Sequence, residues 1–463
     1  MKKLKHDLSL RMVKLLPILL AAIPFTACWF LFFDDTIMAP FFNMGNWMII
    51  GLFVVLYVFF ARTYDAFLVS INRISEIAYS QCLAVLVSDA IMFVVLWLLN
   101  HSFPNILPCI ATLAVQGILV IIWSFAAHKW YFKAFPPKKT AVIHDSRYPV
   151  VDLMREYGQE KKFDVQKWIP EENCEERIAE LAEFSVVFLC GVSSHKRNTI
   201  LKYCVEKGIS VYMLPRIGDI IMSGATPMHM FHLPMFRVDR WNPHPEYKLL
   251  KRLFDILSSA LVLLLVSPIM IVTAIAIKVT DGGPVFYKQD RLTKDGKVFK
   301  VLKFRSMRVD AEKDGVARLS TGDKDDRITP VGRIIRKVRI DELPQLLNIL
   351  QGSMSVVGPR PERPEIAAQY EETLPEFRLR LQAKAGLTGY AQVYGKYNTT
   401  PYDKLQMDLM YIARPSFVED LKIIFATIKI LFVPESTDGI AEGQTTAAVN
   451  PEAEKEPVGA GKE

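Results

Sequence analysis

The chain has 463 residues, of which 51% are hydrophobic, and its formal net charge is +7. The hydrophobic residues crowd into the first 130 residues and a stretch near residue 265, which excludes an ordinary soluble protein. The 6 cysteines have no CxxC spacing, which argues against a disulfide framework or a zinc site. The positive charge suits anionic partners, although a positive-inside bias of membrane loops also explains it.

The N-terminal region contains four apolar runs, most of them close to the ~20 residues that a helix needs to cross a bilayer. Basic residues flank the first and last runs, whereas the first loop carries Asp34 and Asp35. This alternation predicts a four-helix membrane bundle over residues 1–130 with both ends in the cytoplasm, and a buried soluble bundle would not need it. The runs lie at 15–33, 47–61, 83–99 and 106–127.

The next region, 131–245, has short apolar runs that alternate with helical patterns, which favours a small parallel α/β domain. The turn after its first strand, 144–147, lacks the G-x-G-x-x-G spacing that cradles a phosphate. A structural or regulatory role is therefore favoured over a nucleotide site. The expected strands are 140–143, 163–168, 185–189 and 210–214, and the expected helices are 149–157, 175–181 and 196–205.

A fifth apolar stretch, 253–277, is interrupted by Ser267 and Pro268. Lysine and arginine residues precede it and Lys278 follows it, which favours both ends on the cytoplasmic side. A proline inside a helix removes a hydrogen bond and bends the chain. We therefore predict a helix over about 250–278 that enters the membrane, breaks and returns, with a simple crossing as the alternative.

Two short basic sequence motifs, which we call words, follow this stretch in the sequence. In the first, K-F-R-S-M, strand alternation would place Lys303 and Arg305 on one face, although a solvated sheet edge is the plainer interpretation. In the second, G-P-R-P, two prolines fix the backbone around Arg360, whose guanidinium can fork onto phosphate oxygens. A rigid turn with an exposed arginine is the alternative. The word G-L-T-G at 386–389 is a small-residue turn, which leaves room for a ligand to approach the backbone but means little as a turn alone.

The strongest word is R-K-V-R-I-D-E-L-P-Q, which places Asp341 and Glu342 at an expected helix start. The helix dipole and Arg336 just upstream should both favour an ionised Asp341. An ionised carboxylate can attack phosphorus, and a neighbouring glutamate can hold Mg²⁺. On spacing alone, a plain N-cap role for Asp341 is the better interpretation.

The order of these words over about 246–433 resembles the bacterial sugar transferase family, the monotopic phosphoglycosyl transferases. The bundle and the α/β domain in front match its large branch. The resemblance implies an α-helical membrane bundle, a cytosolic Rossmann-like α/β domain (131–245), an α+β catalytic domain with a re-entrant membrane helix (246–433) and, from composition, a disordered tail (434–463).

The resemblance implies transfer of a sugar-1-phosphate from a UDP-sugar to undecaprenyl phosphate with release of UMP, at the start of exopolysaccharide, capsule or O-antigen synthesis. Asp341 would be the nucleophile, Glu342 would bind Mg²⁺, and Ser267–Pro268 would break the re-entrant helix. Phosphates would be bound by Arg336 and Arg360, with Lys303 and Arg305 as weaker candidates.

The implied location is the cytoplasmic face of a bacterial inner membrane, with lipid but no nucleic acid as a partner and a homodimer as one arrangement. The chain departs from the family's usual K-P-G-L-T-G-W word at Ala385 and Tyr390, which loosens any inference about the sugar. Two rival functions are a membrane-anchored nucleotide sensor without turnover and a transporter. A transporter would need polar residues in the first four runs, and beyond scattered Ser, Thr and Asn we expect almost none.

Overall fold

The computed structural model describes residues 2–37, 44–145, 154–155, 158–240, 243–308, 327–395 and 400–431. The chain divides into two compact units, Met1–Leu214 and Pro215–Glu463. The predicted borders at 130, 245 and 433 stay predictions. The tail from 434, expected to be disordered, lies outside the described residues.

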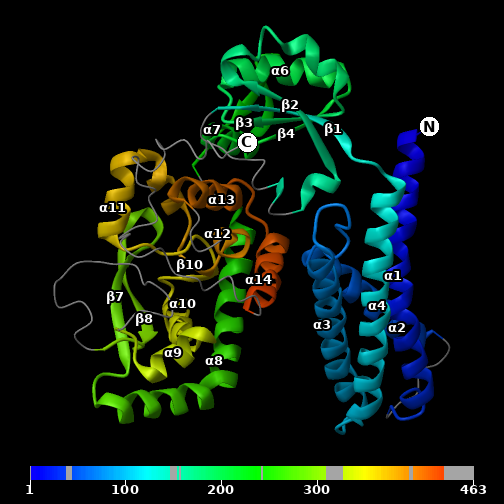
Figure 1. Ribbon diagram of the computed structural model, residues 1–463. Helices are drawn as coiled ribbons and strands as arrows, with labels where there is room; N and C mark the ends of the chain where they lie inside the picture. The colour runs from blue at the N-terminus through cyan, green and yellow to red at the C-terminus, as the bar shows by residue number, and fades with distance from the viewer. Residues whose placement is uncertain are drawn as a thin grey trace, which may run out of the picture. The chain divides into compact units, whose positions relative to one another are not determined.

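Four long helices begin the first unit, as predicted (Figure 1). Each contains a segment that is long and apolar enough to cross a membrane. The predicted loops between them fall at the helix ends. The helices are α1 (Lys2–Phe32), α2 (Gly45–Thr63), α3 (Ile74–Asn100) and α4 (Ile106–Ala134).

The bundle is more polar inside than we expected. Asp89 of α3 lines a cavity of about 30 Å³ together with Cys28, Cys109 and Thr112. Gln116 of α4 is fully buried and donates a hydrogen bond to a carbonyl of α1 at 2.7 Å. The expectation that these runs hold almost nothing more polar than Ser, Thr and Asn is therefore wrong. A cavity of this size accommodates water but is far too small for a sugar.

The second half of the first unit is a parallel four-stranded sheet in the order β2-β1-β3-β4, which confirms the predicted α/β region. The expected helix over 175–181 is instead a 3₁₀ segment, Ile178–Glu183, and the one over 149–157 falls mostly outside the described residues. The elements are β1 (Lys138–His144), β2 (Phe163–Pro170), β3 (Val186–Cys190), α6 (Ser194–Glu206) and β4 (Ser210–Met213).

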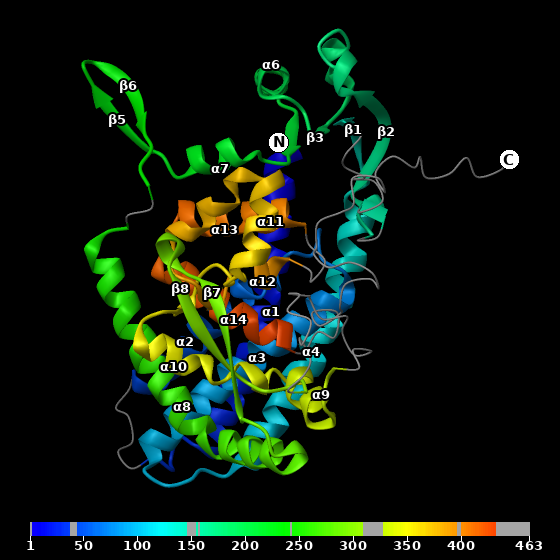
Figure 2. The same cartoon turned by 90° about the vertical axis from the view of Figure 1, so that its left-hand side faces the viewer.

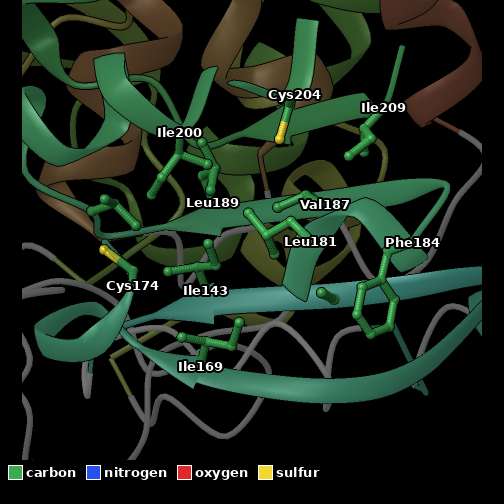
Figure 3. Packing of buried hydrophobic residues seen from close by; sticks show 12 residues of the cluster. Ile143, Ile169, Cys174, Leu181, Phe184, Val187, Leu189, Ile200, Cys204 and Ile209 are labelled. Carbon is green, nitrogen blue, oxygen red and sulfur yellow. The ribbon is translucent and has the colours of Figure 1, made fainter. Parts of the chain in front are cut away.

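Alternate strand residues and one face of α6 form the core of this sheet (Figure 3). Ile143 on β1, Leu189 on β3 and Ile200 on α6 are all fully or almost fully buried. Consecutive residues are buried in β1 and β3, which is why these two strands read as nearly continuous apolar runs in the sequence. The Rossmann-like description stays a prediction.

The edge of this sheet where a phosphate would bind in a nucleotide fold carries the chain's own carboxylates. Glu171 accepts a hydrogen bond from the backbone N–H of Ser193 at 2.6 Å, at the start of α6. The Asp145 carboxyl group packs against Gly191, where an added Cβ would lie 2.6 Å from it. Helix N-termini attract anions, but here a glutamate already lies at that place. The arrangement disfavours an anionic phosphate at this edge.

The second unit begins with α7 and a β-hairpin and continues into the long helix α8. A short antiparallel pair, β7–β8, and a parallel pair, β9–β10, lie among the later helices. The elements are α7 (Ile217–Ser223), β5 (Thr226–Met230), β6 (Leu233–Arg237), α8 (Pro245–Asp281), β7 (Phe286–Leu292), β8 (Val298–Phe304), α9 (Pro330–Lys337), α10 (Gln345–Gln351), β9 (Ser355–Val357), α11 (Pro364–Thr373), β10 (Gly386–Thr388), α12 (Tyr390–Tyr394), α13 (Pro401–Ala413) and α14 (Phe417–Leu431).

Helix α8 has 37 residues and changes direction sharply along its length (Figures 1 and 2). Pro268 lies inside the helix, and the Ser267 hydroxyl donates a hydrogen bond to the Leu264 carbonyl at 2.8 Å. A proline removes one helical hydrogen bond, and such a serine bond favours a bend. The apolar segment is long enough to span a membrane, and its re-entry stays a prediction.

Three glycines allow the backbone of the G-P-R-P word to pack closely against that of the G-L-T-G word. The N–H of Gly358 donates to the Thr388 carbonyl at 2.9 Å, and the N–H of Gly386 donates to the Pro359 carbonyl at 2.9 Å. A Cβ on Gly358, Gly386 or Gly389 would overlap the backbone of the facing segment. The second word therefore holds the first in place, and its glycines face protein backbone.

We expect Gly358→Ala to lower the Tm of the detergent-solubilised chain by about 5 °C, because the new methyl group has no space. Differential scanning fluorimetry measures this. Gly218→Ala in α7 is the matched control, since an added Cβ there meets nothing within 4 Å. Equal Tm values for the two variants would contradict the packing described above.

Candidate active site

The Asp341–Glu342 pair lies in a 3₁₀ turn, Ile340–Glu342, directly before α10. The residue that begins this turn is Arg339, whose φ of 56° is in the left-handed region. The residue that caps α10 is Pro344. The interpretation of Asp341 as a plain N-cap is therefore wrong, because its side chain lies within the turn and not at its start.

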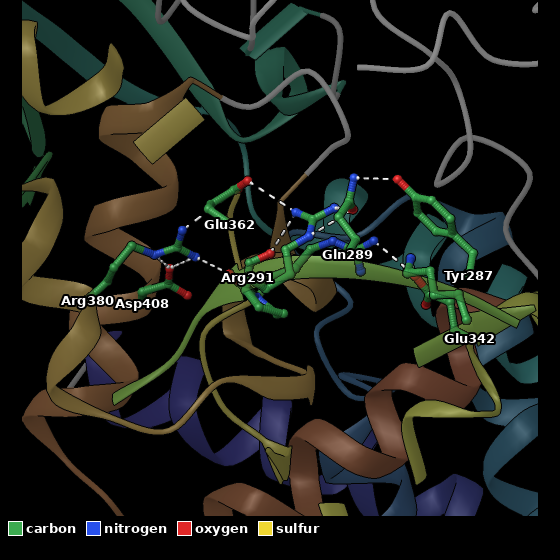
Figure 4. A network of polar contacts seen from close by, with 10 residues as sticks. Tyr287, Gln289, Arg291, Glu342, Glu362, Arg380 and Asp408 are labelled. Atoms are coloured by element: carbon green, nitrogen blue, oxygen red, sulfur yellow. Dashed lines mark hydrogen bonds and ion pairs between the residues drawn. The ribbon is translucent and has the colours of Figure 1, made fainter. Parts of the chain in front are cut away.

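The Glu342 carboxylate joins two segments that are far apart in the sequence. Its Oε1 atom lies 2.9 Å from Lys303 Nζ on β8 and 3.0 Å from Arg360 Nη2 of the G-P-R-P word (Figure 4). Burial acts to raise the pKa of Glu342, but the attraction of Lys303 and Arg360 outweighs it and lowers the pKa below the ordinary value. Glu342 is thus held as a carboxylate.

Asp341 is in a different electrostatic situation from its neighbour. Within the described part of the chain it forms no ion pair of 4 Å or less. Burial raises its pKa, the charge of Glu342 adds to this, and the charges of Lys303 and Arg336 oppose it. The sequence interpretation considered only the effects that favour ionisation of Asp341, and the structure adds the opposing effect of burial.

Two further cations act on this pair. Arg336 lies in the last turn of α9 and lowers the pKa of Asp341. Arg339, which the sequence interpretation missed, is partly buried, and its charge acts on both carboxylates. Arg339 lies in the same basic run as Arg336, and its left-handed backbone conformation leads into the turn that holds the pair. Together with Lys303 and Arg360, these residues are four cations whose charges act on the two carboxylates.

Arg305, another predicted phosphate ligand, is not among the residues whose charges act most strongly on the dyad. Its backbone N–H donates to the Val285 carbonyl at 2.9 Å, just past the end of β8 at Phe304. Arg305 is only 6% exposed, and its guanidinium packs against the backbone of Gly283. The structure thus brings Lys303, Arg336 and Arg360 to the dyad and gives Arg305 a different environment.

Buried arginines hold the G-P-R-P word at its carbonyl groups (Figure 4). Arg380 donates to the Arg360 carbonyl at 2.9 Å and pairs with Asp408 at 2.7 Å. Arg291 donates to the Pro361 carbonyl at 3.0 Å. Sequence analysis assigned the rigidity of this word to its prolines alone and missed these side chains, which carry no recognisable local pattern. Together they aim Arg360 at Glu342.

Comparison with known proteins places this site within a family. The family-wide sequence pattern of bacterial sugar transferases matches residues 246–434. An exopolysaccharide production protein PSS of Rhizobium leguminosarum bv. phaseoli is 44% identical over 188 residues, which are 39% of this chain and 93% of that protein. The chain belongs to the bacterial sugar transferase family. The matched segment holds the dyad, its cations and helix α8.

Two longer relatives are named for a specific reaction. A UDP-glucose:undecaprenyl-phosphate glucose-1-phosphate transferase of Escherichia coli K12 is 40% identical over 212 residues, 45% of this chain and 44% of that protein. A UDP-N-acetylgalactosamine-undecaprenyl-phosphate N-acetylgalactosaminephosphotransferase of Aeromonas hydrophila is 36% identical over 234 residues, 50% of this chain and 54% of that protein. The match to these sugar transferases therefore spans about half of their length.

We expect Glu342→Gln and Asp341→Asn to have different effects on stability. Glu342→Gln loses its attraction to two cations and should destabilise the fold by about 1–3 kcal/mol. Asp341→Asn removes a partly buried carboxyl group that is repelled by Glu342, so its Tm should stay the same or rise. Differential scanning fluorimetry of the two isosteric variants decides this. A larger loss for Asp341→Asn would contradict the charge distribution described here.

Proposed function

We propose that the protein transfers a sugar-1-phosphate from a UDP-sugar to undecaprenyl phosphate and releases UMP. The observation that carries this proposal is the difference between two adjacent carboxyl groups. Glu342 is ion-paired and has a lowered pKa, whereas Asp341 has a raised pKa and no ion pair within the described residues. A carboxylate with a raised pKa is the more basic one and therefore the better nucleophile.

The proposed reaction has two steps. In the first, a carboxylate oxygen of Asp341 attacks the phosphorus that bears the sugar, and the bond from that phosphorus to the UMP oxygen breaks, so UMP leaves with the electron pair. In the second, an oxygen of undecaprenyl phosphate attacks the same phosphorus. The acyl-phosphate bond breaks, and Asp341 returns as a carboxylate. The covalent intermediate lets the two substrates use one site in turn.

The surrounding cations have a separate role in this proposal. Lys303, Arg336 and Arg360 would bind phosphate oxygens and stabilise the charge that develops during transfer. Arg339 adds to the same positive field. We retain Arg305 as a predicted phosphate ligand of lower weight, because its guanidinium packs against Gly283. Cations of this kind suit the negative charge of a diphosphate substrate.

The residues present fit the predicted Mg²⁺. Among the described residues no cluster of three or more His, Cys, Asp or Glu side chains could enclose a metal, but Mg²⁺ is usually held by one or two carboxylates plus substrate phosphates. Glu342, with both ion pairs on Oε1, and Asp341 would supply such carboxylates. The ion would neutralise charge on the diphosphate when bound.

The proposed setting is the cytoplasmic face of a bacterial inner membrane. The chain has membrane-capable helices, and the bend of α8 suits a helix that enters the bilayer and returns. Such a helix would hold the dyad near the lipid phosphates while the nucleotide sugar arrives from the cytosol. The product would initiate exopolysaccharide, capsule or O-antigen synthesis, and the homodimer stays a prediction.

The alternative is a membrane-anchored nucleotide-sensing regulator without turnover. It would need the α/β domain to bind a nucleotide, yet Glu171 and Asp145 lie where a phosphate would be expected. The measurement of turnover separates the two functions directly.

With a panel of UDP-sugars, undecaprenyl phosphate and Mg²⁺ in nanodiscs, we expect UMP release from at least one sugar and at least a thousandfold less from Asp341→Asn. Omission of undecaprenyl phosphate should leave a sugar-phosphate adduct on Asp341, detectable by mass spectrometry of the intact chain. UMP release by Asp341→Asn at the wild-type rate would refute the proposed nucleophile.

The rate of adduct formation should depend on pH through Asp341. The nucleophile must be deprotonated, so the rate should rise with pH through a midpoint above the ~3.9 of an ordinary aspartate. Lys303 is the cation that lowers this pKa most, so Lys303→Met should move the midpoint to higher pH. Single-turnover kinetics measure both midpoints.

Lys300→Met is the matched control for the pH experiment. Lys300 is an exposed lysine of the same strand that pairs with Asp290 at 3.0 Å, so its loss should leave the midpoint unchanged. A midpoint that moves to lower pH in Lys303→Met would contradict the assignment.

A further inference from the structure

Three segments of the C-terminal unit meet around the buried side chain of Thr293. Its hydroxyl donates to the Ser353 carbonyl at 2.9 Å and accepts from the N–H of Ala385 at 3.2 Å. Lys294 and Lys384 are the chain neighbours of these residues, so the junction brings two lysines together. We call Lys294, Lys384 and Arg252 the basic cluster.

Arg252 of α8 joins the cluster from the membrane-capable helix. Its guanidinium donates to the carbonyls of Ile349 and Leu350 at 2.7 and 2.8 Å, at the end of α10. The same group lies 3.4 Å from the position of a Cβ on Gly352, next to Ser353. Because carbonyl partners carry no net charge, these bonds orient the guanidinium without neutralising it.

Of two carboxylates near these residues, Asp295 is paired with a cation outside the cluster, whereas Asp255 binds neutral groups and keeps its charge. Asp255 accepts from the N–H of Val356 at 3.0 Å and from the Ser355 hydroxyl at 3.2 Å. Asp295 pairs with Arg240 at 2.5 Å. Burial lowers the pKa of Lys384, the charges of Arg252 and Lys294 act in the same direction, and the charge of Asp255 opposes them. The three cations of the basic cluster therefore face one carboxylate.

This cluster is distinct from the cations that act most strongly on the dyad, and it lies next to exposed apolar residues of α8. The charges that act most strongly on the dyad are those of Lys303, Arg336, Arg339 and Arg360. The basic cluster instead adjoins exposed leucines within one turn of Arg252 on a helix long enough to span a membrane. These leucines are Leu249 (73% exposed), Leu250 (45%) and Leu253 (51%).

We propose that the basic cluster docks the phosphodiester headgroup of an anionic membrane phospholipid, with the acyl chains along the exposed leucines of α8. Cations at the edge of an apolar helix surface lie at the depth of lipid phosphates, where each attracts anionic lipid. Because Arg252 also binds the end of α10, the bound headgroup would fix the depth of the helix that follows the dyad. The inference does not depend on turnover.

Native mass spectrometry of the full chain with added phosphatidylglycerol tests this proposal. We expect Lys384→Gln to weaken phosphatidylglycerol binding about fivefold and Lys384→Arg to retain it. Lys294→Gln should also weaken phosphatidylglycerol binding. This second variant keeps the test valid if Lys384→Gln alone fails to fold. Lys297→Gln, an exposed lysine close by in the sequence, is the matched control and should bind normally.

Three outcomes would overturn the proposal. Equal weakening by Lys297→Gln and Lys384→Gln would mean general surface charge. Displacement of phosphatidylglycerol by millimolar inorganic phosphate would mean a site for free anions. Tighter binding of undecaprenyl phosphate, lost in Lys384→Gln together with UMP release, would assign the cluster to the acceptor substrate. Loss of lipid binding with normal UMP release supports the docking site and leaves the proposed function intact.

Discussion

One carboxylate, that of Glu342, organises the site. It draws Lys303 of β8 and Arg360 of the G-P-R-P word onto a single oxygen atom, and these two cations come from segments more than fifty residues apart. Two ion pairs at one partly buried oxygen offset the cost of removing that charge from water. Because Lys303 and Arg360 pair with Glu342, these cations stabilise the charge of Asp341 less than that of Glu342. The two neighbours therefore differ in proton affinity although their chain positions are equivalent.

Other residues of the C-terminal unit hold the segments of the active site in position. Arg380 and Arg291 bind carbonyls of the G-P-R-P word, and the glycines at 358, 386 and 389 let two backbones approach closely. Arg252 binds the end of α10, and the dyad lies at the other end of the same helical segment. Because these contacts fix the backbone around Arg360, its side chain loses little conformational freedom when it binds a phosphate.

The parallel sheet of the N-terminal unit carries carboxylates at the edge where a nucleotide fold would bind a phosphate. Its four parallel strands follow an order seen in doubly wound sheets, and ligands usually bind at the strand ends of such folds. Here Glu171 already accepts the N–H at the start of α6, and Asp145 packs on Gly191. Fixed carboxylates at this edge repel a phosphate, which makes a structural or regulatory role the simpler one.

The sequence by itself determined the elements with strong patterns. The four apolar runs became α1 to α4, the strands of the parallel sheet fell where predicted, and the words around Lys303, Asp341 and Arg360 indicated the family. Only the tertiary structure decided which charges meet. Spacing placed Asp341 as an N-cap, because local patterns carry no information on burial or on the turn that a residue joins. The left-handed Arg339, the raised pKa of Asp341 and the hydrogen bonds of Arg291 and Arg380 to the G-P-R-P word all depend on contacts between distant segments.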